Sequence, residues 1–409
     1  MIVLKMAWRN VWRNYRRSLV TIAAMTLALF VELLYAGLVT GLVYGMEEDA
    51  TAYELGDVQI FAKDYPTRPS IYEKVDDPDA LLQKLDAGGF PATARLFGGG
   101  LAASGELSSG ASFVGIDPVR DAATMDLHTA VAEGRWLDDA DPRGVVVGRG
   151  LARVLDLELG DEVLVLSQAA DGSVANDLFE VRGILFSVAA GLDRGGILMT
   201  ESTFRELMVF PSGAHRIYVR KPREMGLAEA GEAVKALVGT PEGTPIDVMT
   251  WKEVQPMLAQ YIDSVAGVVV VLYFIVYLAV GILILNAMLM AVFERIREFG
   301  VLKAIGYGPF QVFSMMVAEG LLQAVVATVI GVVLAAPAMY YLQVVGIDVG
   351  TLGGMQMAGL TMPAVWNAYY TVQTTQVPVF MLFFIVFFAV LYPAVKAAWI
   401  SPVEAMHHQ

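Results

Sequence analysis

Charged side chains of both signs are crowded into one short segment, FERIREFGVLKAIGYG, which lies at 293–308 between two long apolar stretches. The residues that could do chemistry there are Glu294, Arg295, Arg297, Glu298 and Lys303. The glutamates are four residues apart, so a helix would place them on one side, and Gly306 is a typical helix stop. The pattern predicts a short helix that docks in a groove of a soluble partner. The alternative is a solvated connecting loop.

Two carboxylates inside apolar stretches, Glu32 and Glu319, are the other candidate functional residues. Ionisable groups within a membrane are costly and mark functional sites by default. Glu32 follows Arg17 by roughly 21 Å of helix. We expect it either to face a polar cavity or a subunit seam, or to be a protonated or hydrogen-bonded structural residue. Glu319 lies near the start of its stretch, which would place it near the membrane interface.

Motifs for intrinsic catalysis are missing from the sequence. No Gly-Lys pair occurs, so there is no P-loop, and neither H-E-x-x-H nor G-x-S-x-G is found. The four histidines have no ligand spacing apart from the terminal pair His407 and His408, which we interpret as a solvated tail. With no cysteine either, we expect no catalytic residue, no metal site and no cofactor in this chain.

Four apolar stretches are long enough for the roughly 20 residues that a spanning helix needs. Around them the chain divides into a helix at 1–17, spans at 18–46, 264–293, 310–345 and 376–400, a globular domain at 47–263, a short helix at 294–309, a loop at 346–375 and a tail at 401–409. The first span is longer than a signal peptide's apolar region, so we expect an uncleaved anchor.

Basic residues near the span ends predict the orientation. Lys and Arg are frequent in the N-terminal flank and in the 294–309 segment, and the 346–375 loop has none. The positive-inside rule then puts both termini and the 294–309 helix in the cytoplasm, and exports the 47–263 domain. That domain has 19 Lys and Arg against 36 Asp and Glu, which argues against nucleic acid as a partner.

The N-terminal segment LKMAWRNVWRNYRRSL has an apolar stripe at helical period beside a basic side. Trp and Tyr favour the headgroup level, and Arg favours anionic lipid. We expect a helix on the cytoplasmic membrane surface; the alternative is a simple positive-inside tag.

The 47–263 domain alternates short strand and helix patterns, which predicts an α+β fold. Strands are predicted at 56–62, 111–116, 144–148, 161–166, 179–185 and 215–220, and helices at 78–85, 150–157, 201–208, 225–238 and 251–263. The glycine-rich segment 96–111 is interpreted as flexible turns. The helix at 251–263 would continue into the second span as a rigid stalk.

Several segments together resemble the FtsX/MacB-type ABC transporter permeases. ERIREFGVLKAIGYG is similar to their coupling-helix signature, VAEGLLQAVVATVIGVVLA (317–335) to the following span, and YPAVKAAWISPVEAMHH (392–408) to their C-terminal tail. The segments at 145–165 and 4–22 resemble the conserved piece of their periplasmic domain and their N-terminal flank. Among the branches, LGDVQIFAKDY (55–65) and the unfused chain are most like the lipoprotein-releasing LolC/LolE-like subunits.

The resemblance implies a bacterial inner-membrane permease that pairs with a second permease, identical or homologous, and with a dimeric cytoplasmic ATPase that carries ATP and Mg. Docking would involve Glu294, Arg295, Arg297, Glu298, Lys303 and Gly306. The leading function is extraction of lipoproteins from the outer leaflet for a periplasmic carrier. The alternatives are a MacB-like efflux permease that works with an adaptor protein, or an FtsX-like mechanical signalling subunit.

A lipid-anchored substrate would need an apolar site that is open to the outer leaflet. The candidate lining on the first span is Phe30, Glu32, Leu34, Leu38 and Leu42, and on the second Val265, Val268, Val269, Leu272 and Ile275. Ordinary helix packing or lipid exposure would give the same apolar residues.

Overall fold

The structure is a computed structural model that describes residues 2–13, 15–63, 65–186, 190–239, 245–348, 356–357, 360–361 and 365–399. The chain divides into two compact units. The membrane unit comprises residues 1–44, 263–349 and 365–409, and the inserted unit comprises residues 45–262 and 350–364.

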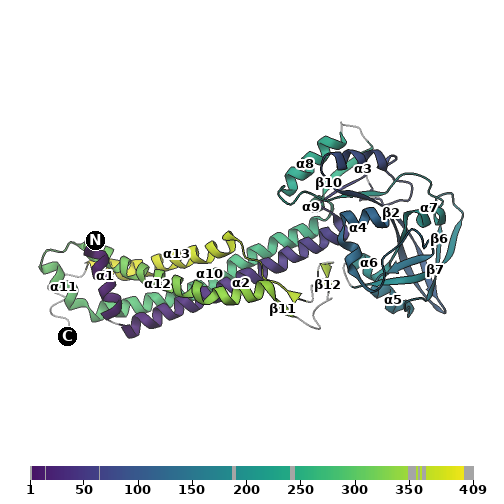
Figure 1. Cartoon of the computed structure of the whole chain (residues 1–409). Helices are drawn as coiled ribbons and strands as arrows, with labels where there is room; N and C mark the ends of the chain where they lie inside the picture. Colours follow the sequence, from purple (N-terminus) through teal and green to yellow (C-terminus); the bar gives the residue numbers. More distant parts are fainter. Residues whose placement is uncertain are drawn as a thin grey trace. The chain divides into compact units, whose positions relative to one another are not determined.

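Among the described residues, four helices are long and apolar enough to cross a membrane, as the sequence predicted. They are α2 (Tyr15–Asp49), α10 (Pro256–Glu294), α12 (Pro309–Val344) and α13 (Val372–Trp399). Two shorter helices, α1 (Ile2–Arg13) and α11 (Ile296–Ala304), lie together at one end of the membrane unit (Figure 1). All six helices contribute side chains to one apolar core, which includes Val11, Leu29, Tyr277, Phe299, Met316 and Val390.

Two glycines bring α2 against the segment that precedes α13. A Cβ on Gly37 would lie 2.0 Å from the Tyr370 ring, and one on Gly41 would lie 1.9 Å from the Asn367 carbonyl oxygen. The backbone N–H of Tyr369 donates to the Gly37 carbonyl at 2.9 Å. The absence of side chains at these positions, four residues apart, therefore allows this close approach.

The inserted unit is built on one ten-stranded sheet in the order β10-β1-β9-β2-β3-β8-β5-β7-β4, with β6 paired to β2 and β7. All pairs are antiparallel except β3–β8 and β5–β7. The strands are β1 (Val58–Ala62), β2 (Ala92–Ser104), β3 (Leu107–Ile116), β4 (Val131–Gly134), β5 (Gly144–Val147), β6 (Glu162–Gln168), β7 (Val174–Leu185), β8 (Gly196–Thr200), β9 (Arg216–Val219) and β10 (Ile246–Thr250). The predicted mixture of strands and helices is confirmed, including each of the six predicted strands.

Short helices cover the sheet and connect its strands. They are the π-helix η1 (Ala50–Leu55), α3 (Pro78–Ala87), α4 (Pro118–Thr124), the 3₁₀ helix η2 (Asp126–Ala130), α5 (Arg149–Leu155), α6 (Ala190–Gly195), α7 (Glu201–Leu207), α8 (Leu227–Val238) and α9 (Trp251–Val254). Two-residue strands also pair, β11 (Ile347–Asp348) with β14 (Val365–Trp366) and β12 (Gln356–Met357) with β13 (Leu360–Thr361).

Two sequence predictions about this unit are wrong. The segment 96–111 forms most of the β2–β3 hairpin rather than flexible turns, and its glycines make room for neighbours: a Cβ on Gly100 would lie 2.3 Å from the Leu166 carbonyl oxygen. The predicted helix at 251–263 is interrupted at Gln255, because the residue before a proline is disfavoured in the helical region and Pro256 starts α10. The predicted continuation of this helix into the second span is confirmed from Pro256 onward, since α10 extends to Glu294.

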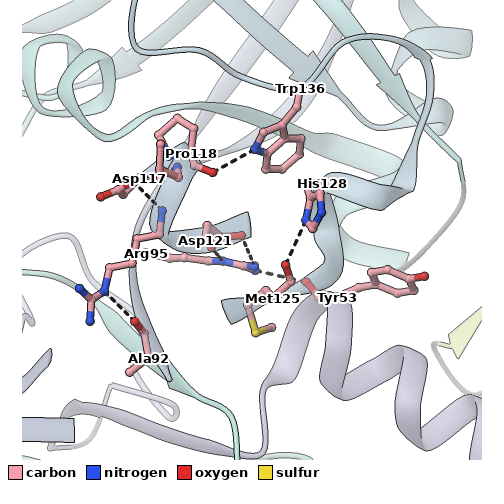
Figure 2. Close-up of polar contacts among 11 residues, drawn as sticks. Tyr53, Ala92, Arg95, Asp117, Pro118, Asp121, Met125, His128 and Trp136 are labelled. Atoms are coloured by element: carbon pink, nitrogen blue, oxygen red, sulfur yellow. Dashed lines mark hydrogen bonds and ion pairs between the residues drawn. The ribbon is translucent and has the colours of Figure 1, made fainter. Parts of the chain in front are cut away.

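A buried ion pair ties three elements of the inserted unit together (Figure 2). From β2, Arg95 Nε donates to Asp121 Oδ2 at 2.8 Å and Nη2 donates to Oδ1 at 3.1 Å, so the pair is bidentate. The remaining nitrogen, Nη1, donates to the Tyr53 carbonyl at 3.3 Å. Because the last carbonyls of a helix lack partners within that helix, Arg95 stabilises the end of η1 against α4 and the sheet.

Candidate docking site around α11

The connection between α10 and α12 is a short helix with defined ends. Arg295 leaves the helical path of α10, and α11 follows from Ile296 to Ala304. Gly306 has φ of +107°, a backbone conformation that favours glycine, and its N–H donates to the Lys303 carbonyl at 3.0 Å. The prediction that Gly306 ends this helix is confirmed.

One face of α11 is anchored in the apolar core. Ile296, Phe299 and Gly300 are buried, and Phe299 belongs to the same core cluster as Val11 of α1 and Val312 of α12. The opposite face leaves Arg297, Val301 and Ile305 exposed. The helix therefore presents one side to any partner and is held on the other by its own chain.

Ion pairs tie the N-terminal part of this connection to three other helices. Arg13 of α1 pairs with Glu298, and Arg17 of α2 pairs with Glu294 through two hydrogen bonds. Arg295 donates to Glu298 at 2.9 Å and to Glu319 of α12 at 3.2 Å. Glu298 and Arg295 thus belong to one chain of charges that joins α1, α11 and α12.

Arg295 is buried, although the docking role expected of it would need contact with a partner. Its side chain is 7% exposed and that of Glu319 is 6% exposed. The docking role predicted for Arg295 therefore does not extend to direct contact in this arrangement. Its guanidinium instead neutralises Glu319, because an unpaired charge in an apolar interior is strongly destabilising.

Hydrogen bonds and burial shift the pKa values of three charged groups in the site. Burial raises the pKa of Glu298, but hydrogen bonds from Arg13 and Arg295 outweigh it and hold that pKa below its usual value. The hydrogen bond to Glu298 raises the pKa of Arg13, and burial lowers the pKa of Lys303, whose ammonium donates to the Ala398 carbonyl. The carboxylate of Glu298 is therefore kept ionised at neutral pH.

A hollow of about 460 Å³ opens between α1, α11 and α12. Its wall combines charged and apolar side chains, which are Met6, Asn10, Arg13, Arg295, Arg297, Glu298, Val301, Leu302 and Met315. Beyond it, the side chains of Ile305 and Phe310 are largely exposed. The exposed apolar residues Val301, Ile305 and Phe310 were not predicted as part of the site, although large apolar side chains within and just after a charged segment are a signal for it.

The predicted substrate-lining residues differ in exposure. Phe30 and Val269 pack against the core, whereas Val268, Leu272 and Ile275 are exposed. Half-buried positions are occupied by Leu34, Leu38, Leu42 and Val265.

The side chain of Glu32, on α2, is buried inside the membrane unit. It is 2% exposed and its Oε2 has no hydrogen-bond partner among the described residues. It lies within electrostatic range of the phenol groups of Tyr273 and Tyr277. It is therefore a buried, incompletely satisfied polar residue of the helix core.

Within the described residues, no cluster of three or more His, Asp or Glu side chains could hold a metal ion. The charges around α11 are paired acids and bases, which suit recognition of a protein surface better than coordination of a cation.

Two family models together cover most of the chain. The MacB-like periplasmic core domain matches residues 18–237, and the FtsX-like permease C-terminal matches residues 270–402. An uncharacterized ABC transporter permease of Methanocaldococcus jannaschii is 26% identical over 218 residues, a match that covers 50% of this chain and 51% of that relative. The chain thus spans about half the length of the curated relative it matches.

Solved structures of related description also align with this chain. The periplasmic region of MacB from Actinobacillus actinomycetemcomitans has 16% sequence identity and a TM-score of 0.38, and the alignment covers 53% of this chain and 98% of that one. The extracellular domain of the noncanonic ABC-type transporter YknZ from Gram-positive bacteria has 17% identity and a TM-score of 0.33, with 47% and 99% covered.

Proposed function

We propose, from the premise that this chain belongs to the FtsX/MacB-type family of ABC transporter permeases, that it is a multi-pass membrane subunit whose α11 docks a separate cytoplasmic ATPase. ATP and Mg would bind to that subunit, and a second permease, identical or homologous, would complete the assembly. Both termini and α11 would then lie in the cytoplasm, as the distribution of Lys and Arg predicts.

The observation that carries this proposal is the way α11 is held. Its outer face is exposed, while Arg295, Glu298 and Phe299 attach it to α1, α12 and the apolar core. A force on the exposed face would therefore move these helices together rather than bend a loose connection. The motion would reach the inserted domain through α2 and α10, the helices that enter and leave it in sequence.

Charge reversal at α11 tests the docking role. Arg297→Glu changes an exposed residue of α11, so we expect at least about a tenfold weaker co-purification with the ATPase subunit, as for charges that become desolvated in an interface. Arg153→Glu, an exposed residue of α5, is the matched control and should leave the complex intact. Unchanged complex yield and coupled hydrolysis for both Arg297→Glu and Glu298→Lys would rule out docking at α11.

For the cargo, we propose lipoproteins that are extracted from the outer leaflet and passed to a periplasmic carrier. The resemblance of residues 55–65 to the lipoprotein-releasing branch supports this choice. The match of residues 18–237 to the MacB-like domain favours a second candidate, an efflux permease that works with an adaptor. Genes for a carrier, an adaptor or a cell-wall hydrolase beside this one would separate transport of lipoproteins, efflux and an FtsX-like signalling role.

Photocrosslinking tests where a lipid anchor would enter. Leu38 is half-buried on α2 and Val269 packs against the core from α10, so a photoreactive residue at either position samples the apolar walls of the membrane unit. We expect both to capture lipid-modified protein in working membranes. If they capture only permease or bulk phospholipid, while sites in the inserted domain capture substrate, lateral entry is wrong.

A further inference from the structure

Five large apolar side chains are exposed together on one face of the sheet in the inserted unit. They are Leu101 of β2, Leu164 and Leu166 of β6, and Val174 and Leu178 of β7, with exposed fractions of 49%, 41%, 41%, 72% and 37%. We call these five residues the leucine face. The three strands that carry it are neighbours in the sheet (Figure 1).

The strand register makes the leucine face one surface rather than scattered residues. Leu101 pairs with Leu166 across β2 and β6, and Leu164 pairs with Leu178 across β6 and β7. Directly opposed side chains on one face of a sheet are in contact distance. The alternate residues Val163 and Val165 are fully buried on the other face, where they join the domain core.

The charges around the leucine face are almost all of one sign. Across segments 99–112 and 161–182, Glu162 and Glu180 pair with each other across β6 and β7 and lie on the leucine face by the same alternation. Glu106 and Asp171 lie in the turns that join β2 to β3 and β6 to β7, and Arg182 is the one base in these segments. Arg182 is already engaged, because it pairs with Asp141 at 2.8 Å and with Glu180. The surface therefore has an apolar centre and an acidic edge.

We propose that the leucine face is a docking surface for a soluble protein whose own binding face has an apolar centre edged by Lys and Arg. An apolar centre with a charged rim is the usual anatomy of protein interfaces, and contiguous exposed apolar patches mark interaction sites. The acidic edge selects a partner of opposite charge.

The same charges argue against a second copy of this chain, or a membrane surface, as the partner of the leucine face. In a self-complementary contact, a second copy of this chain would bring only acidic rims together, with no free base in these segments to offset them. An anionic membrane surface would repel the acidic edge as well. The proposal concerns a surface distinct from α11 and does not depend on which cargo the permease handles.

Photocrosslinking in cells identifies the occupant. The full chain carries p-benzoylphenylalanine at Leu164 or Leu178, with the same residue at Val154 as control. Val154 is an exposed apolar residue on α5, whose buried residues pack on the opposite face of the sheet. We expect one soluble protein to be captured at the two leucine-face positions and not at Val154. Capture of only a second permease copy or of lipid, or no product above that of Val154, would overturn the proposal.

Binding measurements then test whether the captured protein recognises this surface. The probe is that protein, purified, against the full permease chain in nanodiscs. We expect Leu164→Ser combined with Leu178→Ser to weaken binding at least about tenfold, as for residues at an interface centre. Glu162→Lys should also weaken it and reduce its dependence on salt, because this rim charge is exposed and screened.

Both variants change exposed residues, so their melting temperatures should match that of the parent chain, and this is measured first. Binding that both variants leave unchanged would contradict the proposal even if a protein had been captured. Since Arg297→Glu tests the α11 site separately, loss of ATPase docking and loss of binding at the leucine face are distinguishable results.

Discussion

Arg295 and Glu319 are two buried charges whose stability depends on each other. They lie 24 positions apart in sequence, and Arg295 Nη1 donates to Glu319 Oε2 at 3.2 Å in a surrounding of apolar side chains. Removal of Arg295 leaves Glu319 buried without its cationic partner, which costs about 3–5 kcal/mol, whereas removal of both leaves an apolar contact.

Arg295→Met is therefore expected to lower the free energy of unfolding by about 3–5 kcal/mol. The double variant Arg295→Met with Glu319→Leu should recover most of that loss. Thermal unfolding of the purified chain in detergent measures both. The matched control is Arg297→Met, an exposed arginine two residues away, which should change stability little. If the single and double variants lose the same free energy of unfolding, the loss does not come from leaving Glu319 without Arg295.

The buried imidazole of His215 is expected to make the stability of the inserted unit sensitive to acid. The Phe97 N–H donates to its Nδ1 at 2.9 Å, so Nε2 carries the proton and donates to the Ile71 carbonyl at 3.2 Å. Burial, followed by the charges of Arg205, Arg216 and Lys74, lowers its pKa to about 4 from 6.5. Protonation at Nδ1 would break the hydrogen bond from Phe97.

The sign of the pH effect follows from the lowered pKa. The unfolded chain takes up a proton near pH 6.5 and the folded chain only near pH 4, so the stabilisation is complete above 6.5 and lost as the pH falls between these values. We expect a loss of about 1.4 kcal/mol per pH unit in that window. His215→Asn keeps an acceptor for Phe97 but does not titrate, so the same pH slope in that variant would refute the assignment to His215.

At the scale of elements, α2 depends on Gly37 and Gly41 for its packing in the membrane unit. Both face the segment 367–370, and any Cβ there would overlap with it. Gly41 meets backbone atoms, which cannot rotate away as the end of a side chain can. Gly41→Ala is thus the more demanding substitution of the two.

We expect Gly41→Ala to destabilise the chain by about 1–3 kcal/mol, which is typical of overpacking. Gly45→Ala, on the same helix, places its Cβ in open space and should be neutral or slightly stabilising, because alanine is the better helix former. Thermal unfolding of the two variants side by side gives the comparison. If Gly45→Ala is as harmful as Gly41→Ala, helix propensity rather than the close approach controls α2.

For the whole molecule, we expect ATP hydrolysis to be carried out by a subunit separate from this chain. The sequence holds no P-loop, so we expect the purified chain to show no ATP hydrolysis and to acquire it only with a separate nucleotide-binding subunit. Hydrolysis is measured by phosphate release from the chain alone and from the reconstituted complex. A variant of the ATPase subunit that lacks its own P-loop lysine is the control for contamination. Robust hydrolysis by the chain alone would refute the proposal.

Much of the fold could be predicted because its signals are local. Long uncharged stretches predicted α2, α10, α12 and α13, alternation of apolar residues predicted six strands, and Gly306 predicted the end of α11. Each depends on the conformational preference or hydropathy of residues that are neighbours in sequence, and tertiary packing did not override them. Where the local signal misled, as at 96–111, glycines that resembled turn formers were required by close strand packing.

The site could be located from the sequence but its roles could not be assigned. Residues 294–306 stood out by charge alone, yet the sequence did not indicate that Arg295 would turn inward to Glu319, or that Arg13 would reach Glu298, 285 positions away. The leucine face likewise exists only because the register of three strands aligns Leu101, Leu164 and Leu178 on one side. Hydropathy and helical period are properties of a segment, whereas the partner of a charge or the exposure of a leucine depends on which distant segment packs against it. The sequence by itself thus determined the elements of this protein and where its charges gather, and the tertiary structure decided which charges are paired, buried or presented to a partner.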